Sequence, residues 1–190
     1  MPSTPPVVVA LIVAAGIWYL VETRQALLQR PEARSADRKS VWVVRASAVI
    51  AAAVAIAAQR MVPSARLPFG SLALWIGLAF LACGTGLRLW SFRSLGRYFT
   101  FTVQTSQDQP VISAGPYRVI RHPGYTGSLL AVIGVGFFLR NWLSLLILTG
   151  VIFCGLVYRI RVEERALSRD LGGRYQVYAE GRKRLVPFIW

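Results

Sequence analysis

The sequence predicts an all-α integral membrane protein with five transmembrane helices, and its composition and charge pattern support that prediction. Of the 190 residues, 55% are apolar and only 16% are charged. The mean hydropathy of +0.49 is higher than soluble domains of this size usually have. Charged residues are absent from three long runs, residues 1–21, 67–87 and 141–158. Each run is close to the roughly 20 residues that a helix needs to cross the hydrocarbon core of a bilayer.

Two more segments complete the five predicted spans. Residues 122–139 form a fourth apolar run, and residues 41–59 form a fifth that only Arg45 interrupts. Arg45 is close enough to one end for its guanidinium to reach the head groups. The run at residues 1–21 could also be a signal peptide, but it lacks a basic start and a good cleavage site. It is therefore predicted to be a membrane anchor.

The distribution of Lys and Arg predicts the orientation of these helices. Segments 22–40, 88–121 and 159–190 together hold 18 of the 22 basic residues, whereas the other two connections hold three. Basic residues in short loops stay on the cytoplasmic side. The amino terminus is therefore predicted outside and the carboxyl terminus in the cytoplasm, in the inner membrane if the source is bacterial. All eight acidic residues also fall on this inner face, so polar chemistry is expected there.

The composition also limits the kind of ligand. A net charge of +14 alone would suit a nucleic acid, but beside long apolar runs it is more typical of basic loops at anionic lipid head groups. One histidine and two cysteines cannot assemble a zinc or iron–sulfur site of the usual kind. We therefore expect contact with membrane lipids, and neither a nucleic-acid partner nor a metal.

The predicted inner connection after the third span begins as a continuation of that helix. Gly96 is predicted to end it, because glycine commonly ends helices. Beyond it, Phe99, Phe101 and Val103 alternate with polar residues, a pattern typical of extended or hairpin structure. These side chains could anchor the chain at the membrane interface or line a pocket, and both alternatives stay open.

The start of the fourth span combines polar, aromatic and turn residues. His122 precedes a proline, which pushes it toward extended backbone, and Pro123 suits the first turn of a helix. The helix is therefore predicted to expose its first N–H groups at the inner face, where they would attract a carboxylate or phosphate. Gly124 and Gly127 would let either a ligand or another helix approach closely.

The fifth helix is predicted to run on past the bilayer with one acidic residue in an apolar stripe. A buried carboxylate is costly unless it is paired, so Glu164 is predicted either to pair with an arginine or to contact a ligand. Glu163 lies one step around the helix and is predicted to form an exposed pair with Arg159. The stripe itself consists of Leu156, Ile160, Glu164, Leu167 and Leu171.

Five short motifs flank a predicted two-helix hairpin: Gly115-Pro116-Tyr117-Arg118, Arg121-His122-Pro123-x-Tyr125-x-Gly127, Glu163-Glu164-x-x-Leu167, Tyr175-x-x-Tyr178 and Arg184-Leu185-Val186-Pro187-Phe188-Ile189. With these motifs, roughly residues 87–190 resemble the isoprenylcysteine carboxyl methyltransferase family and its prokaryotic relatives. Phospholipid methyltransferases and the carboxy-terminal part of sterol reductases share a looser form of the same pattern.

The resemblance implies a cytoplasmic pocket for S-adenosylmethionine, with S-adenosylhomocysteine as the product, built from the C-terminal half. It implies an N-terminal three-helix membrane region at 1–87 and a catalytic region at 88–190. Arg184 and Arg121 would orient the acceptor, with Glu164 as the third catalytic residue. Where the family often has an arginine after the second tail tyrosine, this sequence has Gly181 followed by Arg182, so the orienting cation stays open. The implied cofactor-binding residues are His122, Pro123, Tyr125, Gly127, Glu163, Glu164, Tyr117 and Gln104.

The predicted function is methyl transfer to a lipophilic, isoprenoid-like small molecule or prenylated substrate at a carboxylate, which needs neither a metal nor a general base. Alternatives are a phospholipid or amine N-methyltransferase, a sterol-reductase-like enzyme using NADPH, and a non-catalytic basic membrane scaffold. Which of Glu163 and Glu164 contacts the cofactor stays open. The oligomeric state is open as well, because small residues such as Gly77 and Gly84 could support a dimer.

Overall fold

The computed structural model describes residues 34–37, 39–96, 103–105, 110–187 and 189–190, with the backbone alone for 34–37 and 103–105. The first predicted span, residues 1–21, lies outside this part of the chain. Four long helices dominate the described residues: α2 (Lys39–Met61), α3 (Leu72–Leu95), α4 (Pro123–Phe138) and α5 (Trp142–Leu171). Two 3-10 turns, η1 (Pro63–Ala65) and η3 (Gly115–Arg118), and a short helix α6 (Gly173–Ala179) connect and follow them.

Three of these helices, α2, α3 and α5, are long and apolar enough to cross a membrane. Helix α4 is apolar but has only 16 residues, which gives it a length of about 24 Å. All four helices match predicted spans, although the described residues contain three helices of spanning length rather than five. Helix α5 continues well beyond its predicted apolar run because its second half is amphipathic and packs against the tail.

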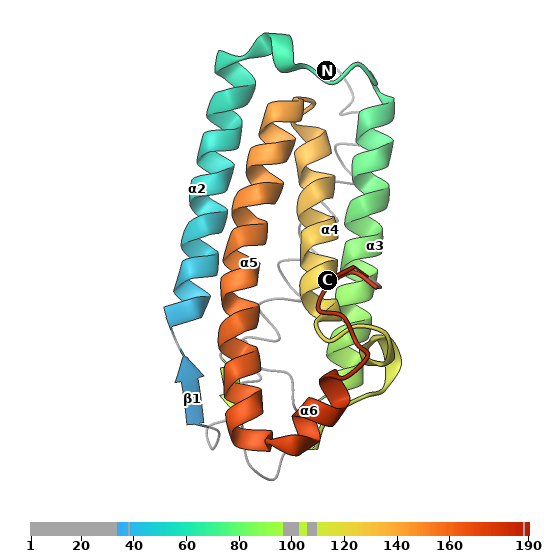
Figure 1. Ribbon diagram of the computed structural model, residues 1–190. Coiled ribbons are helices and arrows are strands. Elements are labelled where there is room, and N and C mark those ends of the chain that lie inside the picture. Colours follow the sequence, from blue (N-terminus) through green and yellow to red (C-terminus); the bar gives the residue numbers. More distant parts are fainter. Residues whose placement is uncertain (1–33, 38, 97–102, 106–109, 188) are drawn as a thin grey trace.

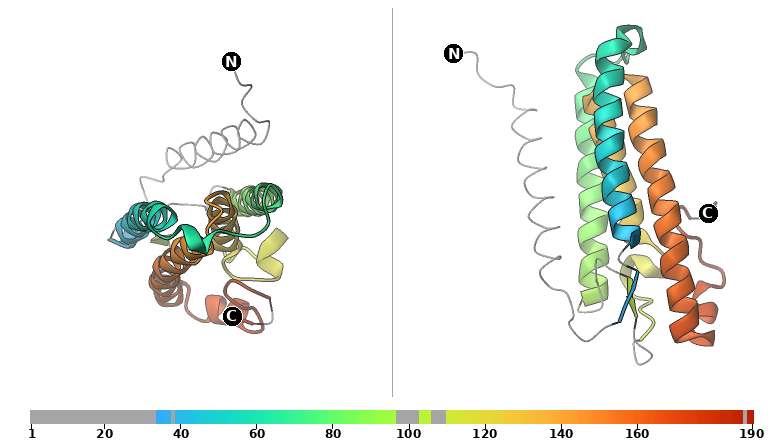
Figure 2. Two further views of the ribbon diagram at one scale, coloured as in Figure 1. Left: turned by 90° about the horizontal axis from the view of Figure 1, so that it is seen from above. Right: turned by 90° about the vertical axis from the view of Figure 1, so that its left-hand side faces the viewer.

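The helices lie in the order α2, α5, α4, α3, so the two helices that are last in sequence lie between the two that come first (Figures 1 and 2). The most extensive contacts join α3 to α4 and α2 to α5. Helices α4 and α5 form a hairpin around Arg140, whose φ of 51° allows the tight turn. The hairpin places the start of α4 and the end of α5 at the same end of the bundle as Leu95. We call this end the polar end.

Glycines allow α3 and α4 to approach at backbone distance. A Cβ atom on Gly77 would lie 2.8 Å from the Gly134 carbonyl oxygen, and one on Gly84 would lie 2.5 Å from that of Gly127. The relationship is reciprocal, since Cβ atoms on Gly127 and Gly134 would each lie 2.6 Å from the carbonyl oxygen of the glycine opposite. Close approach through small residues is a common way to pack membrane helices. Gly77 and Gly84 therefore serve packing within the chain rather than a dimer.

The polar end contains one feature that differs from the all-α prediction, a short β-ribbon. Strands β1 (Arg34–Asp37) and β2 (Val103–Thr105) form a two-stranded antiparallel ribbon with an irregularity between Ser35 and Asp37. The extended structure predicted around Val103 is thus confirmed at residues 103–105, but its partner is a segment before α2 rather than a local hairpin. Helix α3 ends at Gly96 as predicted, where φ is +52°.

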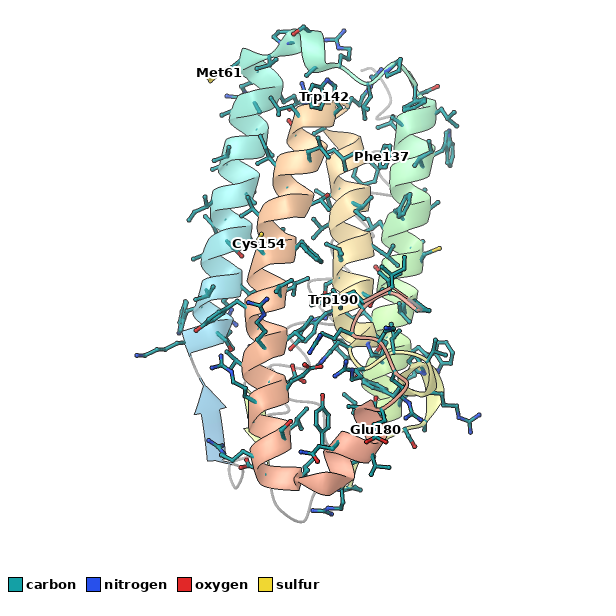
Figure 3. The ribbon with its side chains drawn as sticks, viewed as in Figure 1. Met61, Phe137, Trp142, Cys154, Glu180 and Trp190 are labelled. Carbon is teal, nitrogen blue, oxygen red and sulfur yellow. The ribbon has the colours of Figure 1, made fainter. Side chains whose placement is uncertain are left out.

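The tail crosses the start of α4 and then returns along the bundle. The backbone N–H groups of Arg121 and His122 donate to the carbonyls of Lys183 and Arg184, at 2.8 and 2.9 Å. The tail then brings Trp190 to Phe153, halfway along α5, with ring centroids 5.9 Å apart (Figure 3). His122, Pro123 and Gly124 are buried, and Gly124 contacts Arg88 of α3. The prediction that the start of this helix is exposed is therefore wrong, because the tail and α3 cover it.

Candidate functional site

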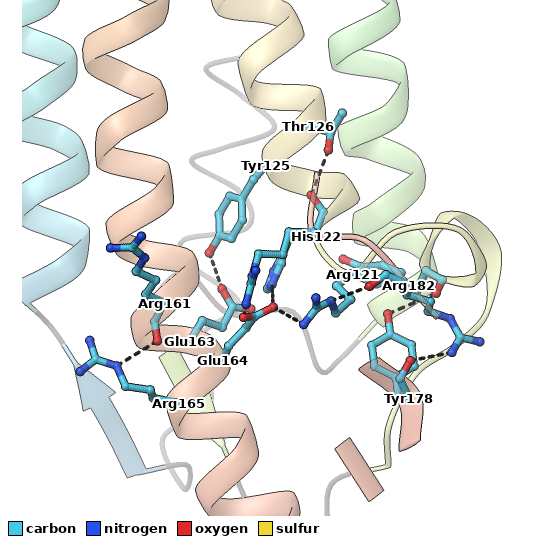
Figure 4. Close-up of polar contacts among 12 residues, drawn as sticks. Arg121, His122, Tyr125, Thr126, Arg161, Glu163, Glu164, Arg165, Tyr178 and Arg182 are labelled. Atoms are coloured by element: carbon cyan, nitrogen blue, oxygen red, sulfur yellow. Dashed lines mark hydrogen bonds and ion pairs between the residues drawn. The ribbon is translucent and has the colours of Figure 1, made fainter. Parts of the chain in front are cut away.

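A cluster of charged side chains lies at the polar end, where three parts of the chain meet (Figure 4). The start of α4 contributes Arg121 and His122, the second half of α5 contributes Glu163 and Glu164, and the tail contributes Arg184. His122 has φ −127° and ψ 56°, so it avoids the helical conformation that its proline neighbour disfavours but does not reach the extended backbone that was predicted. Its ring then points toward α5 rather than along its own helix.

Glu164 is the centre of the cluster. Its Oε1 accepts a hydrogen bond from Nη1 of Arg121 at 2.7 Å, and its Oε2 accepts one from Nε of Arg184 at 2.8 Å. Nε2 of His122 lies 3.3 Å from Oε1, and the role of that nitrogen depends on the tautomer. The arginine pairing predicted for Glu164 is confirmed. Its partners are the same two arginines that the family resemblance implies for the acceptor.

Glu163 has a different environment, because a neutral phenol contacts it. The Tyr125 hydroxyl donates to Oε2 of Glu163 at 2.6 Å, and Nε of Arg159 donates to the same hydroxyl oxygen at 2.7 Å. Arg159 is only 6% exposed. The prediction of an exposed Glu163–Arg159 pair is therefore wrong, since Arg159 is buried and the Tyr125 hydroxyl lies between the two side chains.

Three tyrosines outside the long helices pack beneath the two carboxylates. The Tyr178 hydroxyl donates to the carbonyl of Tyr117 at 3.2 Å. Burial raises the pKa of Tyr178 to about 12, and burial, reinforced by the nearby Glu163 charge, raises the pKa of Tyr117 well above its usual value. Both phenols therefore stay protonated at neutral pH, so neither serves as a base, and Tyr178 acts as a hydrogen-bond donor.

Tyr175 on α6 has a buried hydroxyl with no hydrogen-bond partner among the described residues. Its side chain is 5% exposed, and burial followed by the charges of Glu164 and Glu163 raises the pKa of its phenol. Arg121 opposes that rise without forming a hydrogen bond of good geometry. Buried polar atoms without a partner are rare in folded proteins, and many of them lie where a water molecule, an ion or a ligand binds.

Three of the predicted cofactor-binding residues do not join this cluster. Pro123 is fully buried under the tail. Gly127 faces α3, and a Cβ there would lie 2.9 Å from the Arg88 amide nitrogen, so helix packing explains this glycine. Gln104 pairs with Ser35 in the ribbon, and its side chain lies outside the part of the chain that the structure describes.

The tail arginine that replaces the family pattern holds the tail in place. Arg182 stacks over the Tyr178 ring at 4.7 Å and donates to the carbonyls of Tyr178 and Arg118, at 2.6 and 3.2 Å. Through these three contacts the Arg182 guanidinium holds the tail against Tyr178 and Arg118. Arg184 is the tail arginine that contacts Glu164.

Sequence reasoning did not assign a role in this cluster to three residues, Tyr175, Arg159 and Ser40. Tyr175 belongs to the quoted Tyr-x-x-Tyr motif, so the motif could have identified it. The burial of Arg159 and its contact with Ser40 on α2, at 3.0 Å from Nη1 to Oγ, depend on tertiary packing. No local sequence pattern indicates that contact.

The cluster suits a ligand that carries both positive and negative groups. Glu163 and Glu164 can accept from an ammonium or from hydroxyl groups, while Arg121 and Arg184 can bind a carboxylate. Within the described residues no three His, Cys, Asp or Glu side chains gather as metal ligands. Apolar helices that meet a charged cluster at one end define a membrane protein with a candidate polar site at its boundary.

Residues 72–174 match the family model of the phospholipid methyltransferases. Because this match covers more than half of the 190 residues, the chain belongs to the phospholipid methyltransferase family. The matched region contains α4, α5 and both carboxylates, whereas α2 and the tail arginines lie outside it.

Curated relatives point to one branch of that family. A probable protein-S-isoprenylcysteine O-methyltransferase of Oryza sativa is 34% identical over 117 residues, which are 60% of this chain and 61% of the relative. Protein-S-isoprenylcysteine O-methyltransferase B of Arabidopsis thaliana is 30% identical over 120 residues, with the same coverage. The chain thus spans about three fifths of the length of these relatives. The resemblance that the motifs predicted is confirmed.

A solved structure shares the fold. The eukaryotic intramembrane Ras methyltransferase, an isoprenylcysteine carboxyl methyltransferase, matches with a TM-score of 0.68 at 22% identity. The match covers 99% of this chain and 70% of that chain. The arrangement of helices is therefore common to both proteins.

Proposed function

We propose that this protein is an integral-membrane methyltransferase that moves a methyl group from S-adenosylmethionine to a carboxylate on a lipophilic, isoprenoid-like acceptor. The observation that carries the proposal is the geometry at Glu164, where Arg121 and Arg184 meet beside a second carboxylate that can still accept a hydrogen bond. The acceptor is a lipophilic small molecule or a prenylated substrate. The named activity of the curated relatives supports this choice.

In the proposed topology the chain crosses the membrane five times and its polar end faces the cytosol. The basic residues of segments 88–121 and 159–190 support this orientation. Residues 88–190 form the catalytic region and residues 1–87 the N-terminal membrane region. A water-soluble cofactor then approaches from the cytosol, and an apolar acceptor approaches through the lipid.

The residues of the cluster fit S-adenosylmethionine. Among the described residues, Glu163 receives one hydrogen bond, at Oε2, so Oε1 can accept from the cofactor's ammonium or ribose hydroxyls. The Tyr175 hydroxyl has a proton to donate and no acceptor within the same part of the chain. Glu164, in contrast, already receives guanidinium groups on both oxygens. Glu163 is therefore the carboxylate that we assign to the cofactor.

The two arginines are suited to the acceptor. Guanidinium groups bind carboxylates through paired hydrogen bonds, and each of these arginines uses only part of its donor set on Glu164. When bound, S-adenosylmethionine supplies an electrophilic methyl group on a sulfonium. Arg121 and Arg184 hold the acceptor carboxylate in line with that methyl group, and orientation of this kind contributes up to about 7–11 kcal/mol in favourable systems.

A carboxylate acceptor fits the cluster better than an amine does. An amine acceptor needs a base to remove its proton, and Glu164 would be the nearest candidate. Two guanidinium groups stabilise the anionic form of Glu164, so it is a weak base. The same environment holds an anionic acceptor without any proton transfer.

The experiment is calorimetric titration of the purified full-length protein with S-adenosylhomocysteine, together with transfer of labelled methyl groups to membrane lipid extracts. We expect micromolar binding that Glu163→Gln weakens at least ten-fold. Glu180→Gln is the matched control, since this exposed carboxylate lies outside the cluster. NADPH that displaces S-adenosylhomocysteine would favour a reductase instead, and salt-sensitive lipid binding without cofactor affinity would favour a scaffold.

A further inference from the structure

A directed chain of hydrogen bonds runs from α2 through α5 and α4 to Glu163. Arg159 can only donate, so the Tyr125 oxygen must accept from it and the single phenolic proton must go to Glu163. For the same reason Ser40 accepts from Nη1 of Arg159, at 3.0 Å. The direction of every bond in this chain is therefore fixed, unlike the bond of His122, which depends on the tautomer.

Packing on both sides restrains the Tyr125 ring. The His122 ring stacks on it with centroids 5.6 Å apart, and the Arg159 guanidinium lies 5.8 Å from its centroid. A phenol held in this way has little freedom to turn its hydroxyl away from Glu163. The Tyr125 side chain thus reaches α5 at a defined point.

Arg159 is held in turn by the close packing of α2 on α5. One turn before Arg159, a Cβ atom on Gly155 would lie only 2.7 Å from Oγ of Ser47, so the two helices are nearly in backbone contact there. Ser40 is completely buried at the start of α2. Helix α2 lies outside the residues that match the family model. Through Ser40 and Arg159 it nevertheless supports the Glu163 carboxylate, which lies within the matched residues.

We propose that Tyr125 and Arg159 are positioning residues for Glu163, with Ser40 as the anchor of the network on α2. Tyr125 then does not contact the cofactor. Its hydroxyl occupies Oε2 and fixes the carboxylate plane, so that Oε1 is presented to the cofactor. This inference rests on the proposed function, because it takes Glu163 as the cofactor-binding carboxylate.

The test is a double-mutant cycle measured by calorimetric titration of the full-length protein with S-adenosylhomocysteine. We expect Tyr125→Phe, which keeps the stacked ring and loses the hydroxyl, to raise Kd about ten-fold. We expect Glu163→Gln to raise it at least as much. The double variant should bind no more than two-fold more weakly than Glu163→Gln alone, since Tyr125 acts only through that carboxylate. Effects that multiply in the double variant would overturn the proposal.

Variants of Ser40 and Arg159 test the anchor. Ser40→Ala should raise Kd about three-fold, and Arg159→Lys should raise it less than Arg159→Ala, because lysine keeps the charge but not the planar fork. Tyr158→Phe removes an exposed phenol next to Arg159 and should leave Kd unchanged. Thermal unfolding of each variant separates a loss of fold from a loss of binding. If Ser40→Ala and Arg159→Ala both fold and bind like the wild type, the anchor role is wrong.

The cycle also separates this inference from the proposed function. A folded wild-type protein that does not bind S-adenosylhomocysteine would contradict the proposed function and, with it, this inference. Wild-type binding that is insensitive to Tyr125→Phe would contradict the positioning role alone.

Discussion

The Arg184 guanidinium donates to Glu164 at 2.8 Å across 20 positions of sequence that include all of α6. This contact ties the tail to α5, and the tail in turn covers the start of α4. This ion pair and the backbone hydrogen bonds between the tail and the start of α4 together join the three parts of the chain that form the candidate site. Because the Arg184 side chain is 34% exposed, the pair itself adds little to stability, and its importance lies in the position that it gives the guanidinium.

We therefore expect Arg184→Lys to affect the acceptor more than the cofactor. Lysine can keep one contact with Glu164 but cannot bind a carboxylate with two parallel hydrogen bonds. The kcat/KM for the acceptor should fall at least ten-fold, while Kd for S-adenosylhomocysteine stays within about two-fold. Steady-state kinetics and calorimetry on the same preparation measure both. A large change in cofactor affinity with normal acceptor kinetics would contradict the assignment.

The glycine contact between α3 and α4 allows a matched comparison on one helix. Gly84→Ala places a Cβ against the backbone of α4, and overpacking of this kind costs about 1–3 kcal/mol. Gly86→Ala places its Cβ in open space inside the same helix, so the free energy of unfolding should stay the same or rise by up to about 1 kcal/mol, because alanine favours a helix interior. Denaturant or thermal unfolding in micelles distinguishes the two. Equal effects would mean that α3 and α4 do not pack as described.

The unsatisfied hydroxyl of Tyr175 predicts opposite effects on stability and on binding. Tyr175→Phe removes a buried polar atom that lacks a partner among the described residues, so the unliganded protein should unfold at the same temperature or a higher one. Affinity for S-adenosylhomocysteine should fall about three- to ten-fold if this hydroxyl donates to the cofactor. Tyr178→Phe is the control, because its hydroxyl has a protein acceptor and its loss should cost about 1 kcal/mol of stability. Unchanged affinity in Tyr175→Phe would remove Tyr175 from the site.

The buried phenols also predict how stability depends on alkaline pH. Burial raises the pKa of Tyr178 in the folded protein to about 12, whereas an unfolded tyrosine titrates near pH 10. The fold thus favours the neutral phenol, so this contribution is complete below about pH 10 and is lost as the pH rises toward 12. The thermal midpoint should stay constant between pH 8 and 9 and fall above pH 10, less steeply in Tyr178→Phe. A midpoint independent of pH up to 11 in both proteins would contradict this expectation.

Local sequence patterns predicted the helices well, because a helix-ending glycine, a helix-starting proline and an apolar stripe each indicate one kind of local structure. Gly96 ends α3 and Pro123 begins α4 as expected. Of the apolar residues in the stripe around Glu164, Leu156, Ile160 and Leu171 are buried as the spacing predicted, and Leu167 is half-buried. Four of the five predicted membrane runs coincide with helices α2 to α5, although α4 is shorter than a typical span, and the first run lies outside the described residues. These features depend on residues within one or two turns of each other.

The errors concern contacts between distant segments. Nothing near His122 indicates that residues 183–184 will cover the start of α4, and nothing near Glu163 indicates that Tyr125 will lie between it and Arg159. Likewise, the α3 glycines could have faced a second copy of the chain, and only the tertiary arrangement shows that they face α4. A sequence pattern predicts which face of a helix is small or polar, but it does not predict which other segment packs against that face.

The contact between Ser40 and Arg159 constrains the order in which the molecule can be completed. These residues are 119 positions apart, so α2, α3 and α4 are all synthesised before Arg159 leaves the ribosome. Until then Ser40 and the Tyr125 hydroxyl lack this partner, and Glu163 does not yet exist. A chain that stops anywhere in the first half of α5 can insert its earlier helices into the bilayer, yet it cannot assemble the carboxylate site. In this protein the polar site is therefore finished only when α5 has docked against α2.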